Sequence, residues 1–102
     1  MTSIQEPRKL LVARILEGDG TASQQLRRAA FANKDLSEPL RILINTVAEN
    51  PHAVTDEHVS SALASGCSED QLFELVVCAA VGQSTRQHDA ALRALAAAVS
   101  ES

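Results

Sequence analysis

Apolar residues recur three and four positions apart through most of the chain, which is the spacing of one face of an α-helix. No segment shows the strict alternation of a half-buried strand, and the sequence contains no internal repeat. Turn signals follow each apolar segment after a short interval, so the loops are short. The pattern predicts an all-α fold, a compact bundle of about six helices.

The first two helices are bounded by proline and glycine signals. One is predicted from near Pro7, because the fixed φ of proline suits the start of a helix, to Gly18. The second is predicted over residues 22–32, with a stop at Asn33. Its inward side is expected to carry Leu26, Ala29, Ala30 and Phe31, with Arg27 and Arg28 outward.

Two helices are predicted in the middle of the chain. Ser37 is expected to cap the first, which ends before Pro51 because proline has no N–H to continue the helix. Thr55 is expected to cap a shorter one that closes at Gly66. The buried faces are expected to carry Leu40, Leu43, Ile44 and Val47 in the first, and Val59, Ala62 and Leu63 in the second.

The most informative segment is apolar almost all the way round. Ser68 and Gln71 form a predicted capping box, after which residues 72–81 contain a single charged side chain, Glu74. A helix of this kind must be covered on every side. Because the chain has only 102 residues, we expect neighbouring copies to supply part of that cover. A kink or restart is predicted near residues 82–85, before a last helix whose stripe carries Leu92, Leu95, Ala96 and Val99.

Length and charge restrict the function classes. The 102 residues predict a single domain, and the net charge of −4 argues against a nucleic-acid surface. No apolar run approaches the roughly 20 residues that span a bilayer, and no secretory signal pattern begins the sequence. We therefore expect a cytoplasmic protein with no membrane and no nucleic-acid partner.

The segment HVSSALASGCSEDQLFELVVCAAVG, which begins at His58, and the Ala- and Leu-rich helix after it resemble the carboxymuconolactone decarboxylase and alkylhydroperoxidase D (AhpD-like) family. The likeness covers about residues 39–99. It implies a small all-α fold whose central helix hairpin packs against other subunits in a homo-oligomer, a trimer or a hexamer.

The chain resembles a member of that family that lacks the peroxidatic CxxC motif. Aligned on His58, the two thiol positions hold Pro51 and Val54, so a two-cysteine cycle has no route through this segment. In the decarboxylase branch, the resemblance places His58 at the family's histidine and Cys78 at a cysteine of its core helix.

Three polar residues are candidate catalytic groups. His58 lies in a first helical turn, where the helix dipole favours the neutral imidazole of a general base, although a surface histidine explains the position equally. Glu74 either is buried and paired with Arg86 or Arg41, or lines a pocket between subunits. Arg86 either holds a substrate carboxylate or pairs with Asp89 or Glu74.

The cysteines and remaining histidines carry weaker signals. Cys78 is a further catalytic candidate, against the alternative of core packing, and Cys67 reads as an exposed loop thiol. His88 falls on an apolar stripe, as a core or interface histidine does. The spacings of His52, His58 and His88 preorganise no metal site, and we expect neither a metal nor a cofactor.

Three functions stay open on the sequence alone. The first is a non-redox assembly module or one that binds a small-molecule ligand. The alternative is a small decarboxylase-like enzyme that acts on a carboxylated small molecule through His58, Glu74 and Arg86 at a pocket between helices or subunits. The third is a single-cysteine peroxidase that uses Cys67 or Cys78.

Overall fold

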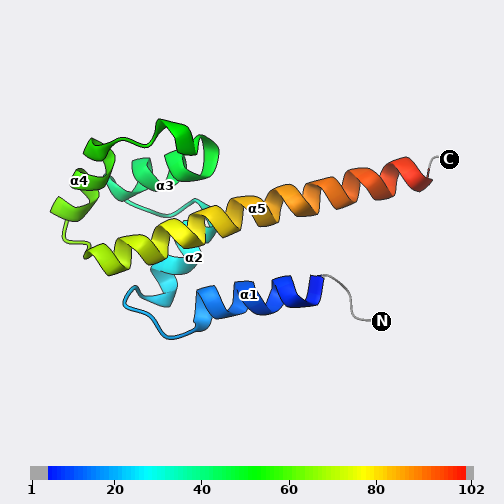
Figure 1. The fold of residues 1–102 in the computed structure, drawn as a ribbon, viewed down its shortest axis with the longest axis horizontal. Coiled ribbons are helices and arrows are strands. Elements are labelled where there is room, and N and C mark those ends of the chain that lie inside the picture. Colours follow the sequence, from blue (N-terminus) through cyan, green and yellow to red (C-terminus); the bar gives the residue numbers. More distant parts are fainter. Residues whose placement is uncertain (1–4, 101–102) are drawn as a thin grey trace.

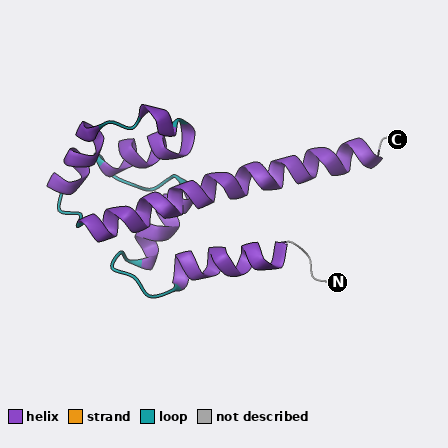
Figure 2. Ribbon diagram, in the orientation of Figure 1, coloured by secondary structure: helices purple, strands orange, loops and turns teal. Residues whose placement is uncertain are grey.

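The computed structural model describes residues 5–100, with side chains from Arg8 onward, and the described chain is helical without a strand (Figures 1 and 2). The all-α prediction is confirmed. Within these residues the helices number five α-helices and one 3₁₀ turn, and not six α-helices. The elements are α1 (Gln5–Glu17), α2 (Gln24–Ala32), α3 (Leu40–Glu49), η1 (Pro51–Ala53), α4 (Asp56–Ala64) and α5 (Glu69–Ser100).

The 32-residue α5 sets the shape of the molecule. At 1.5 Å per residue it is about 48 Å long, and the described chain measures 54 × 29 × 20 Å. Figure 1 shows α2, α3 and α4 gathered around the first half of α5, while α1 runs antiparallel to α5. The break predicted at residues 82–85 is wrong, because the helix passes through it.

The hydroxyl groups of residues 84 and 85 bond back to the helix that carries them. Ser84 Oγ and Thr85 Oγ1 donate to the carbonyl oxygen of Val81 at 3.1 and 2.7 Å, so both hydroxyl groups have their acceptor within α5. The buried Gly82 has a different role. A Cβ on Gly82 would lie 2.0 Å from the carbonyl oxygen of Phe31 in α2, so a glycine is needed where α2 and α5 cross.

Helix caps are predicted with mixed success. The Ser68–Gln71 capping box is confirmed, since the Ser68 N–H donates to Gln71 Oε1 at 3.0 Å and the Gln71 N–H to Ser68 Oγ at 3.1 Å. The prediction that Ser37 caps α3 is wrong. Pro39 occupies the cap position and makes no side-chain cap bond.

The core lies between the first half of α5 and the helices around it. Leu43 and Ile44 of α3 are fully buried with Leu75 and Cys78 of α5, as the apolar spacing predicts. In α2 the predicted face is rotated, because Arg27 is buried at 5% exposure and Leu26 is 38% exposed.

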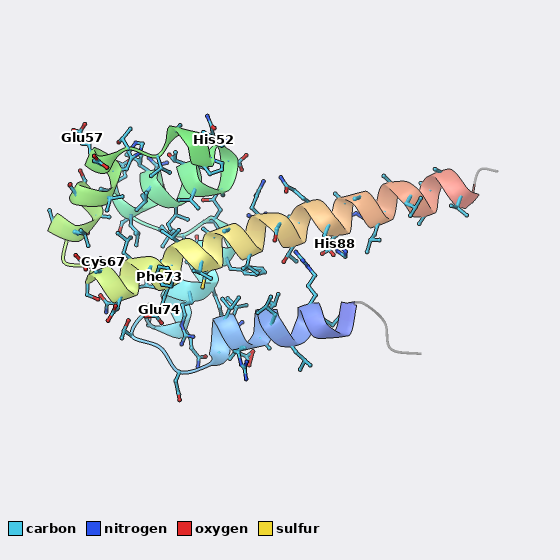
Figure 3. All side chains as sticks on the ribbon, in the orientation of Figure 1. His52, Glu57, Cys67, Phe73, Glu74 and His88 are labelled. Carbon is cyan, nitrogen blue, oxygen red and sulfur yellow. The ribbon has the colours of Figure 1, made fainter. Side chains whose placement is uncertain are left out.

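Residues 72–81 are not covered on every side by the chain itself. Leu72, Leu75, Cys78 and Ala79 are buried, but Phe73 is 71% exposed and Ala80 is exposed as well. The prediction of all-round burial therefore fails for the single chain. Figure 3 shows the labelled Phe73 on this part of α5.

The second half of α5 extends beyond the helices that surround the first half (Figure 1). Its apolar side chains include Leu95, 61% exposed, and Val99, 65% exposed. Exposed leucines also lie on α1, at Leu10 and Leu11. Among the described residues, the most exposed large apolar side chains therefore lie on α1, at Phe73 and on the outer half of α5.

Gly82→Ala tests the crossing of α2 and α5. Alanine stabilises an ordinary helix position by about 0.5–1 kcal/mol relative to glycine, but here its Cβ collides with backbone. We expect the opposite sign, a loss of about 1–3 kcal/mol in the free energy of unfolding measured by urea denaturation. Ala90→Gly, at an exposed α5 position, measures only the difference in helix propensity between alanine and glycine, because no other described helix packs there closely. A Gly82→Ala protein more stable than the parent contradicts the close crossing.

Candidate functional site

Glu74 binds the turn between α1 and α2. Its two carboxylate oxygens accept the N–H of Thr21 at 3.0 and 2.9 Å, and one also accepts the N–H of Ala22 at 3.3 Å. The Thr21 hydroxyl donates to the same carboxylate. A Cβ on Gly20 would lie 2.0 Å from Glu74 Oε1, so this turn can approach the carboxylate only with glycine there.

Arg27 donates hydrogen bonds to carbonyl groups of the same turn and of the end of α1. Its Nε donates to the carbonyl oxygen of Ala22 at 3.1 Å, and its Nη1 to those of Ile15 and Gly18 at 3.0 and 2.7 Å. Gln71 Nε2 adds a bond to the carbonyl oxygen of Thr21 at 3.2 Å. The prediction that Arg27 points outward is wrong, since the residue is buried. Its guanidinium can be buried because these carbonyl groups replace the hydrogen bonds to water that burial removes.

The charges of Glu74 and Arg27 fit this arrangement. The hydrogen bond from the Thr21 hydroxyl is the largest effect on Glu74 and lowers the pKa of its carboxyl group, helped by the two backbone N–H groups and by Arg27, while partial burial acts in the opposite direction. The predicted pairing of Glu74 with Arg86 or Arg41 is not formed. Arg41 pairs instead with Glu38, three residues earlier in the sequence.

Arg86 caps the end of α2. Its Nη1 donates to the carbonyl oxygen of Phe31 at 2.6 Å and its Nη2 to Gln83 Oε1 at 2.9 Å. A cation at a helix C-terminus meets unpaired carbonyl groups and the negative end of the dipole, which is a stabilising position. Neither Asp89 nor Glu74 is its partner. Twelve residues of helix separate it from Glu74, about 18 Å along α5.

His58 belongs to the N-terminal cap of α4. Its Nδ1 accepts the N–H of Thr55 at 3.0 Å, and Thr55 Oγ1 accepts the N–H of His58 at 3.2 Å, so the two residues form a reciprocal capping box. This bond requires a lone pair on Nδ1 and leaves the proton on Nε2. His58 also lines an open pocket of about 380 Å³ whose other walls are Pro39, Ile42, Thr55, Glu57 and Ser61.

Both cysteines are free thiols in apolar surroundings. Cys78 is 1% exposed in the core, and burial raises the pKa of its thiol; Arg27 acts against this shift and Glu74 adds to it. Cys67 is half-buried and packs against two groups of buried residues, one that includes Leu75 and one that includes Leu43. The prediction of an exposed thiol is therefore wrong. Burial also raises the pKa of Cys67. A raised thiol pKa lowers the fraction of reactive thiolate at neutral pH.

The histidines are dispersed over the fold, as Figure 3 shows for His52 and His88. His52 is exposed in η1. The Nδ1 atom of His88 is buried without a hydrogen bond, 3.8 Å from Asp89 Oδ1. Among residues 5–100, no three His, Cys, Asp or Glu side chains are grouped as a metal site requires. In the same part of the chain, no helix combines the length and apolar character needed to cross a bilayer.

The structure does not bring the candidate catalytic residues together. Glu74 faces the α1–α2 turn, Arg86 faces the end of α2, and His58 lines a pocket on α4 that neither of them lines. Sequence reasoning missed Arg27, Thr21 and Gln71, which complete the surroundings of Glu74. The one available signal was the spacing of Arg27 to Ala30 and Phe31, three and four residues on, which puts the arginine on the inner face of α2.

No known protein family matches this chain, and no curated protein and no solved structure resembles it significantly.

Replacing Glu74 with Gln should destabilise the fold in a pH-dependent way. The folded-state pKa of Glu74 is lowered, so its contribution is complete above the ordinary glutamate pKa of about 4.3 and is lost as the pH falls through the folded-state value. At pH 7 we expect a loss of about 1–3 kcal/mol in the free energy of unfolding, because bonds to a charged acceptor are weakened. The difference from the parent should shrink in acid.

Glu49→Gln is the matched control, because Glu49 is exposed at the end of α3 and removing its charge breaks no described bond to the α1–α2 turn. Urea denaturation of parent and both variants from pH 7 to pH 3 measures the effect. Equal curves for the Glu74 and Glu49 variants contradict the assignment of Glu74 to the turn.

The thiols should react slowly in the folded protein. With Ellman's reagent at pH 7 we expect both to react more slowly than in the protein unfolded in guanidinium chloride, and Cys78 more slowly than the half-buried Cys67. Cys67→Ser and Cys78→Ser variants separate the two rates. A folded-state thiol that reacts faster than its unfolded counterpart contradicts the raised pKa values and supports the peroxidase alternative.

Proposed function

We propose that this chain is a non-redox assembly module that associates with further copies of itself through the outer half of α5. The observation that carries the proposal is an apolar stripe on the part of α5 that extends beyond the other helices, in which the side chain of Leu95 is 61% exposed. Stripes of this kind on a long helix are typical of helix–helix interfaces.

The spacing of the stripe fits pairing between helices. His88, Leu92, Leu95 and Val99 follow at intervals of four, three and four residues, which is the a/d repeat of a coiled coil. The segment lies on the same continuous α5 as the core positions, so its direction is fixed by the bundle. A second helix with the same repeat is a suitable partner.

A further copy of this chain satisfies the remaining requirements. Ala91 and Ala96 flank Leu92 and Leu95, so two backbones can approach closely. The only charged residues over residues 87–100 are Asp89 and Arg93, one of each sign, so identical segments meet without a net like-charge penalty. Phe73, on the exposed side of residues 72–81, offers a second apolar contact.

The bonds of the candidate residues favour this function over catalysis. The carboxylate of Glu74, the guanidinium of Arg86 and Nδ1 of His58 are each bound to backbone groups that shape the fold. A group that acts on a substrate has to be within reach of it and able to exchange its partner. These three bonds hold the α1–α2 turn, the end of α2 and the start of α4, which lie around the first half of α5.

The relationship to the carboxymuconolactone decarboxylase and AhpD-like family is part of the proposal, together with a trimeric or hexameric state. It is supported by the all-helical chain, by His58 at the start of a short helix and by the apolar first half of α5. The continuous α5 departs from the central hairpin that the resemblance implies.

Leu95→Glu tests the assembly surface. Size-exclusion chromatography with light scattering should show the parent as an oligomer at micromolar concentration and the variant shifted toward the monomer. Burying a leucine contributes about 1.5–3 kcal/mol, so the dissociation constant should rise by about tenfold or more per contact.

Ala97→Glu is the matched control, because it places the same charge on the same helix two residues away, on the opposite side. It should keep the parent's oligomeric state, and circular dichroism should show both variants folded. A parent that is monomeric throughout the micromolar range overturns the proposed function.

A further inference from the structure

A cleft of about 310 Å³ lies between α1 and α5, away from all the candidate residues described above. Its floor is apolar and is made by Val12, Ala13 and Leu16 of α1. Its polar walls come from both helices, and they are Arg8, Lys9, Glu17, Thr85 and Asp89. The volume is at the lower end of the range for small-molecule sites, about 300–1,000 Å³.

Arg8 lies at one end of this cleft with part of its hydrogen-bonding capacity unused. Its Nη2 donates to Ser84 Oγ at 3.0 Å and to Thr85 Oγ1 at 3.2 Å, which fixes the guanidinium against α5. Its Nε is buried and has no hydrogen-bond partner. Among the described residues, no carboxylate lies within 4.0 Å of it as an ion-pair partner. A buried, positively charged donor without an acceptor is costly, and an external anion would remove that cost.

Neither acidic residue of the cleft is an ion-pair partner of Arg8. Glu17 pairs with Arg28 at 3.1 Å, outside the cleft. The nearest basic nitrogen to Asp89 is His88 Nδ1 at 3.8 Å, on the same helix. Figure 3 shows the labelled His88 on the part of α5 opposite the start of α1. Lys9 adds a second cation to the wall that carries Arg8.

We propose that the α1–α5 cleft binds a small organic carboxylate with an apolar body. The guanidinium of Arg8 receives the carboxylate as an ion pair, because it carries a positive charge and its Nε has no acceptor among the described residues. The apolar body lies on Val12, Ala13 and Leu16. This site goes beyond the proposed assembly function and does not depend on it, since all the residues named belong to one chain.

Octanoate is the probe. Titration into the ¹⁵N-labelled protein should shift the amide signals of the cleft residues in α1 and α5 in a saturable way. Arg8→Gln should weaken binding by about tenfold or more, the loss of a charged hydrogen-bonded partner. Ala13→Met should weaken it without altering any charge, because the longer side chain fills the floor.

Two comparisons separate the site from general effects. Lys34→Gln removes a positive charge on a part of the chain that does not line this cleft, and it should bind octanoate as the parent does. Octylamine has the same apolar body and the opposite charge, so it should not saturate the same signals. Binding of the amine in preference to the acid overturns the proposal, and so does unchanged octanoate binding in both Arg8→Gln and Ala13→Met.

The Leu95→Glu variant distinguishes the cleft from the assembly surface. It should bind octanoate with the parent's affinity, because Leu95 does not line the cleft. Loss of binding in this variant, while it remains folded, overturns a site contained in one chain. A parent protein found to be monomeric but still binding octanoate refutes the proposed function and keeps the cleft.

Discussion

The fold depends on one short turn, between α1 and α2, in which side chains from α2 and α5 bind several backbone groups. Glu74 accepts its N–H groups, Arg27 donates to its carbonyl groups, and Gln71 adds a further donor. Unpaired backbone groups next to a core are expensive, so the turn can pack against α5 only with these partners present. Through the turn, α1 is positioned along α5, which creates the cleft beside Arg8.

Most of the fold follows from the spacing of apolar residues and from cap chemistry, because both are local. The buried face of α3 and the caps at Thr55 and Ser68 need only neighbouring residues to be recognised. The reason for a glycine inside α5 is not local. Gly82 lies against Phe31 of another helix, and when that helix is unknown a glycine near two hydroxyl residues indicates a break.

The candidate site illustrates the same limit. The sequence identifies Glu74 as an unusual carboxylate because it is alone among apolar residues, and that observation is sound. Its partners are the hydroxyl of Thr21 and the backbone N–H groups of Thr21 and Ala22, and no sequence pattern links this turn to Glu74. Charge pairing with Arg86 or Arg41 is therefore the natural hypothesis, and it is wrong. Arg8 was missed for the opposite reason, because an arginine near the start of a helix is unremarkable until α5 is placed beside it.

The distance in sequence between Glu74 and the turn it binds has a consequence for synthesis. Thr21 leaves the ribosome 53 residues before the carboxylate that it needs. During that interval the link between α1 and α2 lacks the carboxylate that binds its N–H groups, and helices of 13 and 9 residues are only marginally stable in isolation. The N-terminal part of the chain must therefore stay loosely arranged until α5 emerges, and the docking of α1 is a late step of folding.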